Sequence, residues 1–559
     1  MIKKLLFISF LLIIGCKERK SAVKGLIAEN GMVVSARVEA SQIGTDILKQ
    51  GGNAFDAMIA TKFALAVAFP FAGNIGGGGF MVYRLNDGTT GTLDFREKAP
   101  LTATKNMYLD SLGNVIEGKS TEGATAVGVP GTVAGIFEIH KKFGSLPMEQ
   151  LIQPAIDLAK KGVLVTENQA RRLEHYKEAI TKISSDTVLF AKNFSAKDSI
   201  KYIELAKTLE VIKEKGKDGF YKGEVAEKIV DFLQKNGGII TLEDLEKYQA
   251  VWRKPVEFSY KNINVISMGP PSSGGITLAQ IMKMIESKGL DSNHNSVKAI
   301  QLITEAERRA YADRAYFLGD PDFTQIPELE ITSSTYLNDR MNFFSYKKAT
   351  PSEEVSHGNI EIIESDQTTH FSIVDQLGNA VSVTTTLNGA YGAKLYSEEL
   401  GFFFNNEMDD FSSKPGVPNM FGLIGGEANS IMPEKRMLSS MTPTIVEKNG
   451  KLLMVLGTPG GSTIITSVLQ TILNVEEYEM GMQEAVNAPR FHHQWLPDEI
   501  RMEPNSFDKE TIKELKDLGY FINESNARII GLVDAVLVLP DGRLEAGADK
   551  RGDDTAIGF

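Results

Sequence analysis

The sequence predicts an α/β (α+β) fold, and three observations support this prediction. Segments with apolar residues at every third or fourth position, typical of amphipathic helices, alternate with short β-branched segments, typical of strands. The 559 residues are sufficient to bury a large core, either as two domains or as one large two-layer unit. The composition, 42% hydrophobic and 24% charged residues, is that of a globular protein.

The first half of the chain is expected to mix strands and helices. Strands are expected within 31–38, 81–85 and 91–100, helices within 39–70, 128–144, 150–240 and 303–320, and two strands, a turn and a helix within 256–287. Gly51 and Gly52 should divide the 39–70 segment into two helices. The glycine run at 74–80 lacks the lysine and the spacing of a phosphate-binding loop, so we expect it to support packing or a pocket wall.

The second half of the chain is expected to form strand pairs. These are 370–375 with 380–387, both strands within 442–458, and both strands within 531–549. The last two pairs contain Asn449-Gly450 and Asp541-Gly542, which are hairpin turn signals. We therefore expect antiparallel sheet in this half.

Two segments have no clear periodicity. The polar stretch 347–366 is expected to be an exposed linker. The stretch 409–436 is long for a loop inside a compact domain, and such loops are usually lids or binding loops, or are disordered. Its apolar residues at 420, 421, 423 and 424 argue against disorder.

The N-terminus has the features of an export signal. Lys3 and Lys4 precede an apolar run at 5–14, which is too short to span a bilayer. Gly15 and Cys16 follow, and they resemble a bacterial lipoprotein box in which Cys16 is lipidated. We expect 1–16 to be the signal segment and 17–26 a solvated tether; the alternative is a plain signal peptide with an incidental cysteine.

Charge and residue counts exclude several classes of site. The net charge of -12 argues against a general nucleic-acid binder, which would carry a basic face. Cys16 is the single cysteine, so neither a disulfide nor a cysteine metal cluster is expected. His370, His492 and His493 have no carboxylate at ligand spacing, so we interpret them as structural and expect no metal and no cofactor.

The hairpin at 368–386 has a register that can be counted. If Gln376, Leu377 and Gly378 form a three-residue loop, Asp375 faces Asn379. Counting outward from that pair places Thr368 opposite Thr386, and directly opposed residues have Cβ atoms about 4.5–5.5 Å apart. Threonine is also a common strand residue, so an ordinary structural pair is the alternative interpretation.

An ordered set of motifs resembles the gamma-glutamyltransferase (gamma-glutamyl transpeptidase) family. The resemblance covers nearly all of 27–559. In the second half the motifs are QTTHFSIVD (367–375), NNEMDDF (405–411), KPGVPN (414–419), LSSMTPTIV (438–446), GTPGGS (457–462) and NAPRFHHQWLPDE (487–499). In the first half they are NIGGGGF (74–80), DFREKAP (94–100), GVPG (128–131), PPSSGG (270–275) and AYADRAYFLGDPDF (310–323).

The resemblance implies a fold and a processing step. The family belongs to the N-terminal nucleophile hydrolases, which share a four-layer αββα sandwich. Its precursors cleave themselves before a threonine, which here implies a cut between Gln367 and Thr368. The products would be a large subunit, 27–367, and a small subunit, 368–559, which remain together as a heterodimer.

The cut has a chemical purpose. A threonine hydroxyl is a weak nucleophile and needs an adjacent base. A freed α-amine has a pKa of about 7.7–8.0 and can accept that proton at neutral pH. Thr368 would then supply both nucleophile and base, and Thr386 matches the second threonine of the family. Gly460 and Gly461 match the N–H donors that stabilise the tetrahedral oxyanion.

The remaining matches follow the charges of a γ-glutamyl group, which carries an α-carboxylate and an α-ammonium. The resemblance assigns Arg96, Ser439 and Ser440 to the carboxylate, and arginine suits it because its planar fork binds carboxylate at two points. It assigns Asn388, Glu407 and Asp410 to the ammonium.

Two matched positions differ among members of the family. Phe421 stands in the lid where well-known bacterial members have a tyrosine that bonds the asparagine matching Asn388. Some bacterial members have glutamine where Glu407 stands. Asp410 and Glu407 together should hold an ammonium more strongly.

The signal segment predicts an exported protein, lipid-anchored at Cys16 on the periplasmic side, and the net charge argues against a nucleic-acid partner. The resemblance implies an enzyme that would move the γ-glutamyl group of glutathione and related compounds to water, an amino acid or a peptide. One alternative is a related acylase acting on a glutaryl group or poly-γ-glutamate, although a glutaryl group has no ammonium. Another is an inactive envelope lipoprotein that only binds γ-glutamyl compounds, against which the intact Thr368, Gly460 and Gly461 argue.

Overall fold

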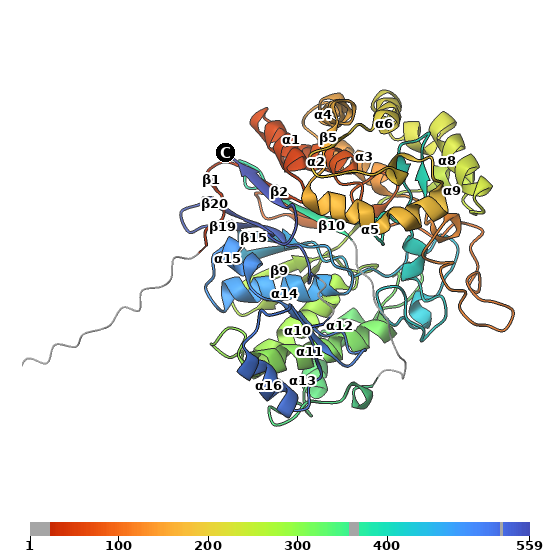
Figure 1. Cartoon of the computed structure of the whole chain (residues 1–559). Helices are drawn as coiled ribbons and strands as arrows, with labels where there is room; N and C mark the ends of the chain where they lie inside the picture. The colour runs from red at the N-terminus through yellow and green to blue at the C-terminus, as the bar shows by residue number, and fades with distance from the viewer. Residues whose placement is uncertain (1–22, 357–367, 526–528) are drawn as a thin grey trace, which may run out of the picture.

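A computed structural model describes residues 23–356, 368–525 and 529–559. Its centre consists of two seven-stranded sheets, and Figure 1 shows them between two groups of helices. One sheet has the order β21 (Thr555–Gly558), β2 (Met32–Ser35), β10 (Thr369–Val374), β11 (Ala380–Thr386), β3 (Gly78–Arg84), β4 (Thr90–Asp94) and β7 (Val251–Arg253). The other has the order β1 (Ile27–Ala28), β20 (Leu544–Ala548), β19 (Asp534–Val538), β15 (Lys451–Gly457), β14 (Thr444–Lys448), β9 (Ile263–Ser267) and β8 (Val256–Tyr260).

Apolar residues fill the space between the two sheets. Val34 and Val82 from the first sheet share one buried cluster with Ile266, Val455 and Val536 from the second. Strands β10 and β11 also contact β15 across this interface. The strands next to the nucleophile candidate are therefore held from both sides of the sandwich.

Helices cover both outer faces. The first sheet is covered by α1 (Val38–Lys49), α2 (Ala54–Ala68), α3 (Thr132–Phe143), α4 (Met148–Lys161), α5 (Glu167–Ser184), α6 (Ile203–Lys215) and α8 (Gly223–Lys235), which share its core cluster. The second is covered by α10 (Gly274–Lys288), α11 (Val297–Phe317), α13 (Ser334–Arg340), α14 (Thr463–Glu476), α15 (Met482–Asn487) and α16 (Lys509–Asp517). Figure 1 shows the two groups above and below the strands, which confirms the four-layer αββα prediction.

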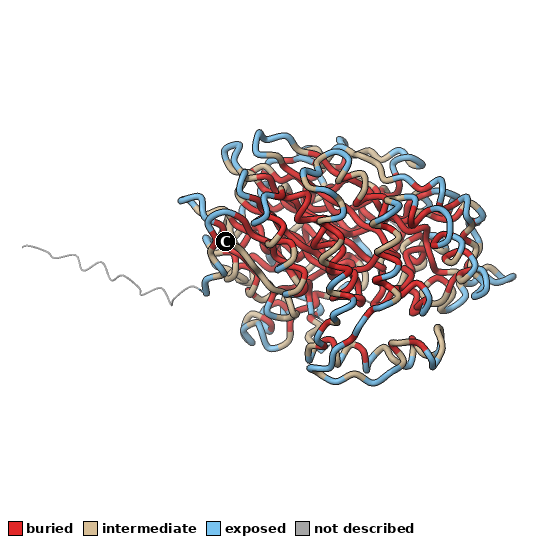
Figure 2. Tube along the Cα trace, turned by 90° about the horizontal axis from the view of Figure 1, so that it is seen from above, coloured by how far each residue is buried: buried red, intermediate tan, exposed pale blue. Residues whose placement is uncertain are grey.

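Helix α2 shows why the layer next to the first sheet is rigid. All of its residues are buried. Figure 2 shows the buried residues of the chain, in red, gathered in its interior. Apolar residues surround the axis of α2, as expected for a core helix rather than a surface one. Asn53 starts it by accepting hydrogen bonds from the N–H groups of Phe55 and Asp56, and the Asp56 carboxylate accepts from the N–H of Asn53.

The counted hairpin register is confirmed. Thr369 pairs with Thr385 and Val374 pairs with Ala380, which is the predicted pairing along the whole ladder. Gly378 has φ +83° in the loop, and the Asp375 carboxylate accepts the N–H groups of Leu377 and Asn379. Continuing the register by one residue places Thr368 opposite Thr386.

The expected exposed linker is confirmed only in part where the structure describes it. Residues 347, 348, 353, 354 and 356 are exposed, but Ser352 and Val355 are buried, and 352–354 form a 3₁₀ turn. The N–H of Ser352 donates to Asp498 at 2.7 Å and its hydroxyl donates to the carbonyl of Trp495, so distant residues anchor this polar segment. The rest of the predicted linker, and Cys16 with the whole of the predicted signal segment, lie outside the described residues.

None of the helices within 23–356, 368–525 and 529–559 combines the length and the apolar character needed to cross a bilayer.

Candidate active site

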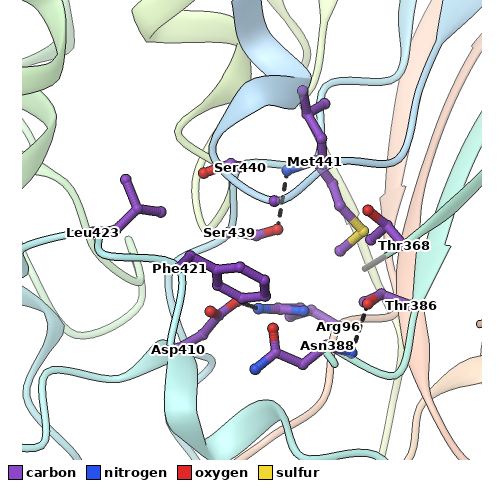
Figure 3. Close-up of a pocket in the computed structure, with 12 residues that line it drawn as sticks. Arg96, Thr368, Thr386, Asn388, Asp410, Phe421, Leu423, Ser439, Ser440 and Met441 are labelled. Carbon is purple, nitrogen blue, oxygen red and sulfur yellow. Dashed lines mark hydrogen bonds and ion pairs between the residues drawn. The ribbon is translucent and has the colours of Figure 1, made fainter. Parts of the chain in front are cut away.

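A small pocket opens where the ends of β10, β11 and β15 meet the long loop after β13 (Phe402–Phe403). Figure 3 shows most of its lining side chains. The lining residues are Arg96, Thr368, Thr386, Asn388, Asp410, Phe421, Leu423, Ser439, Ser440, Met441, Gly461 and Ile464. Gly460 and Glu407 contact members of this set, so the structure brings together every described residue that the sequence predicted for the site.

Thr368 immediately precedes β10 and is 7% exposed, at the wall of the pocket. The N–H of Gly460 donates to the Thr368 hydroxyl oxygen at 2.9 Å. Gly460 and Gly461 have φ of +137° and +53°, in the region that favours glycine. The turn they form connects β15 to the first residues of α14 and directs a backbone donor at the hydroxyl of Thr368.

Thr386 ends β11 and organises the residue that follows it. Its hydroxyl oxygen accepts the N–H of Asn388 at 2.6 Å, while Asn388 has φ +69°. The Asn388 side-chain amide donates to the carbonyl of Asn406 at 3.0 Å and also contacts the sulfur of Met420 at 3.6 Å. Because these contacts occupy the NH₂ group, the carbonyl oxygen of Asn388 is the atom that can accept from a ligand.

Arg96 lies among carboxylates. One guanidinium nitrogen pairs with Glu407 and the other with Asp410, and Glu97 lies 3.6 Å away. The resemblance assigned Arg96 to the carboxylate end of a ligand, and Glu407 and Asp410 to its ammonium end. In the structure these three side chains form one ion-paired cluster. Burial disfavours the charge on Arg96, but Glu407 and Asp410 outweigh it and raise the pKa of Arg96 above its ordinary value.

Glu97 is a site residue that the sequence-based prediction omitted. Neither of its carboxyl oxygens has a hydrogen-bond partner among the described residues, and burial, opposed by Arg96, raises its pKa to about 7. Its position next to Arg96 in the 94–100 motif was the available signal. A Cβ on Gly78 would lie 2.6 Å from its carboxyl oxygen, and one on Gly77 would lie 2.1 Å from the carbonyl of Thr386. The glycine run therefore supports the pocket wall, as predicted.

Ser439 and Ser440 form the opposite wall. The Ser439 hydroxyl oxygen accepts the N–H of Met441 at 3.1 Å, a contact drawn in Figure 3. The Ser440 hydroxyl oxygen accepts from Arg314 at 3.1 Å. Ser273, in the Pro/Gly/Ser turn before α10, donates its N–H to the carbonyl of Ser439 at 2.8 Å, so this turn fixes the position of the serine pair.

The long irregular loop covers the pocket. Phe421 is 4% exposed and points into it (Figure 3). The carboxamide of Asn419 accepts the N–H groups of Phe421 and Leu423 and donates to Asp410 at 3.0 Å. Because Asn419 of this loop is hydrogen-bonded to Asp410, the position of the loop depends on the carboxylates of the pocket.

The histidines near the site are buried and hydrogen-bonded within the protein. His370 contacts the hydroxyls of Thr384 at 2.9 Å and Ser372 at 3.0 Å, and burial lowers its pKa to about 3. His493 contacts Asp498 at 3.2 Å. In the described part of the chain, no group of three or more histidine, cysteine or acidic side chains could hold a metal ion.

The chain matches a family model and curated relatives over most of its length. The model described as gamma-glutamyltranspeptidase matches residues 40–559. The glutathione hydrolase proenzyme of Escherichia coli strain K12 is 46% identical over 538 residues, which is 95% of this chain and 92% of the relative. The glutathione hydrolase proenzyme of Pseudomonas sp. strain A14 is 48% identical over 497 residues, 88% of this chain and 86% of the relative.

A solved structure supports the fold. The cephalosporin acylase of Bacillus halodurans superposes with a TM-score of 0.85, covering 98% of this chain and 99% of the acylase. The two sequences are 23% identical, so this similarity concerns the architecture alone.

The buried His370 predicts acid sensitivity. Because burial lowers its pKa from 6.5 to about 3, the unfolded chain binds a proton in this range that the folded chain excludes. Stability should therefore fall as pH falls from about 6.5 to 3, by up to about 1.4 kcal/mol per pH unit from this group. Melting temperatures from pH 7.5 to 4 should decline less steeply for His370→Gln than for the parent. Parallel curves would show that His370 contributes nothing, since His492 and His493 are present in both proteins.

Proposed function

The chain belongs to the gamma-glutamyltranspeptidase family, and on this basis we propose that it is an autoprocessing enzyme acting on glutathione and related γ-glutamyl amides. It passes the γ-glutamyl group to water, an amino acid or a peptide. The observation that carries the proposal is the position of Thr368, which receives a backbone N–H from Gly460 at 2.9 Å and lines a pocket with groups for both charges of the substrate.

The proposed cut lies between Gln367 and Thr368 and gives subunits 27–367 and 368–559. The arrangement of strands supports their staying together. In one sheet β10 and β11, from the small subunit, lie between β2 and β3 of the large one. In the other, β14 of the small subunit pairs with β9 of the large one. Separating the pieces would break both sheets.

The chemistry begins at the new N-terminus. The α-amine of Thr368 takes the proton of its own hydroxyl, and the hydroxyl oxygen attacks the γ-carbonyl carbon of the substrate. Backbone N–H groups of Gly460 and Gly461 stabilise the resulting oxyanion. The proton passes to the leaving amine as the amide bond breaks. Water or an acceptor amine then attacks the acyl-enzyme and regenerates Thr368.

The serine pair and Arg96 are proposed to bind the α-carboxylate. Both serine hydroxyl oxygens already accept hydrogen bonds from protein N–H groups. Their own hydrogens are then free to be donated to a ligand oxygen. Arg96 supplies the charge-assisted contact.

Asn388, Glu407 and Asp410 are proposed to bind the α-ammonium. Burial raises the pKa of both carboxyl groups above their ordinary values, with Arg96 opposing it. An arriving ammonium would stabilise their charged forms and share the role that Arg96 fills through its ion pairs with them. A zwitterionic ligand thus matches a site that already contains both signs of charge.

The acylase alternative fits less well. A glutaryl group has no ammonium to occupy the acidic side of the pocket. The relatives at 46% and 48% identity are named glutathione hydrolase, whereas the acylase superposed above is 23% identical. Poly-γ-glutamate is a related substrate class within the same alternative.

The proposed location is the periplasmic side of the cell envelope. Residues 1–16 would direct export and lipidation of Cys16, and 17–26 would form the tether. The first described strand, β1, begins at Ile27, directly after this tether.

Thr368→Ala should abolish both processing and turnover, because neither nucleophile nor base would form. Denaturing mass spectrometry should show two pieces divided before Thr368 for the parent and one uncut chain for the variant. Thr368→Ser, which keeps a hydroxyl, is the matched control and should still be cut. An intact parent chain that turns over a γ-glutamyl anilide would contradict the mechanism.

Asp410→Asn should discriminate between substrates. Loss of the negative charge should raise KM for a γ-glutamyl anilide about tenfold or more, the effect of losing a charged hydrogen bond. The glutaryl anilide, which lacks the ammonium, should be affected less. Steady-state kinetics on both anilides test this, and equal losses on the two would remove Asp410 from ammonium binding.

Cys16→Ala should release the protein from the membrane. In a detergent phase separation of cells expressing the full chain, the parent should enter the detergent phase and the variant the aqueous phase. Mass analysis of the parent N-terminus gives a second readout. An unmodified Cys16 in the parent would refute the anchor without affecting the enzymatic proposal.

A further inference from the structure

Arg314 is a buried cation beside the pocket that no step above uses. It lies on α11 and is 4% exposed. Its Nε donates to the hydroxyl of Ser273 at 2.8 Å and its Nη2 donates to the hydroxyl of Ser440 at 3.1 Å. Among the residues that the structure describes, no carboxylate lies within 4.0 Å of its guanidinium. Buried arginines usually have such a partner, and Arg96 and Arg309 both do.

The contact with Arg314 determines how Ser440 can act. A guanidinium only donates hydrogen bonds, so the Ser440 oxygen must be the acceptor. The hydroxyl hydrogen of Ser440 then points away from Arg314. Since Ser440 lines the pocket, this hydrogen is available to an acceptor there. Without this contact the Ser440 hydroxyl could rotate, and its hydrogen would have no preferred direction.

The charges around the pocket give Arg314 a second role. Arg96, the cation expected to meet the substrate carboxylate, already faces Glu97, Glu407 and Asp410. A carboxylate entering this region meets one guanidinium and three acidic groups. Arg314 adds positive charge on the serine side, away from most of the acids. Burial lowers its pKa to about 10, so it is still protonated at neutral pH.

We propose that Arg314 is a positioning residue for recognition of the α-carboxylate: it orients the hydroxyl of Ser440 toward the ligand and supplies positive potential to the serine wall. Ser273, the second hydroxyl held by the same guanidinium, fixes Arg314 to the turn that also positions Ser439. The inference rests on the proposed function, because it concerns one end of a γ-glutamyl group. It predicts that the enzyme loses discrimination for the carboxylate when Arg314 is replaced.

The test compares two anilides in the full, self-cleaved protein. One is the γ-glutamyl anilide and the other is the 4-aminobutanoyl anilide, which keeps the amine and lacks the carboxylate. Arg314→Gln should raise KM for the first about tenfold or more while kcat changes much less. It should leave kcat/KM for the second nearly unchanged. Arg314→Lys, which keeps a charge without the planar fork, should lie between parent and Gln variant.

A double-variant cycle tests whether Arg314 acts through Ser440. If it does, Arg314→Gln and Ser440→Ala together should raise KM little more than the larger single effect. Arg309→Lys is the matched control, because Arg309 lies on the same helix and pairs with Glu305 away from the pocket. It should change neither KM nor the ratio between the anilides.

Each unfavourable outcome has a distinct meaning. Equal losses on both anilides, or additive effects in the cycle, would make Arg314 a structural residue and overturn the inference. If Arg314→Gln is not cut into two subunits, the same comparison is made with Arg314→Lys and Ser273→Ala, and an unchanged KM in both would overturn it. A parent protein that is cut but does not turn over the γ-glutamyl anilide would instead contradict the proposed function.

Discussion

The pairing of β10 with β11 is the constraint on which the rest of the site depends. The two strands lie in the middle of a sheet, pair over six residues each, and are packed against the second sheet on one side and α2 on the other. A slip of one residue would turn every buried side chain to the wrong face. This register is therefore strongly specified, and it places Thr368 at the open end beside Thr386. The donor from Gly460 reaches Thr368 because β15 packs directly against the same pair.

The second constraint is electrostatic. Around the pocket, the basic groups are Arg96 and Arg314, and the acidic groups are Glu97, Glu407 and Asp410. All of them are buried except Asp410, whose side chain is 11% exposed. Isolated buried charges are costly, so these groups must be paired or partly neutralised. Arg96 forms ion pairs with Glu407 and Asp410. The proposed zwitterionic substrate would replace part of that pairing with its own ammonium and carboxylate, and the site would then favour ligands that carry both charges.

Much of this arrangement could be predicted from the sequence. The hairpin register followed from a period of two and a glycine at the turn, and the order of motifs indicated which distant residues converge. The ion pairs of Arg96 could not be predicted, because they depend on the tertiary distance between the ends of β4 and β13. Arg314 lies in the motif at 310–323, yet the spacing of the residues in that motif does not indicate that Arg314 reaches Ser440. The segment around Ser352 was expected to be exposed because it is polar, yet Ser352 itself is buried, and its burial depends on Asp498, far along the chain.

Trapping the acyl-enzyme tests the proposed covalent role of Thr368. Self-cleaved protein would be mixed with a γ-glutamyl anilide, quenched in acid during the first turnovers, and analysed by peptide mass spectrometry. If Thr368 is the nucleophile, the small subunit should gain the mass of one glutamyl group, located on the N-terminal residue Thr368. A glutamyl adduct on any other residue, in protein that is turning over the anilide, would contradict this role.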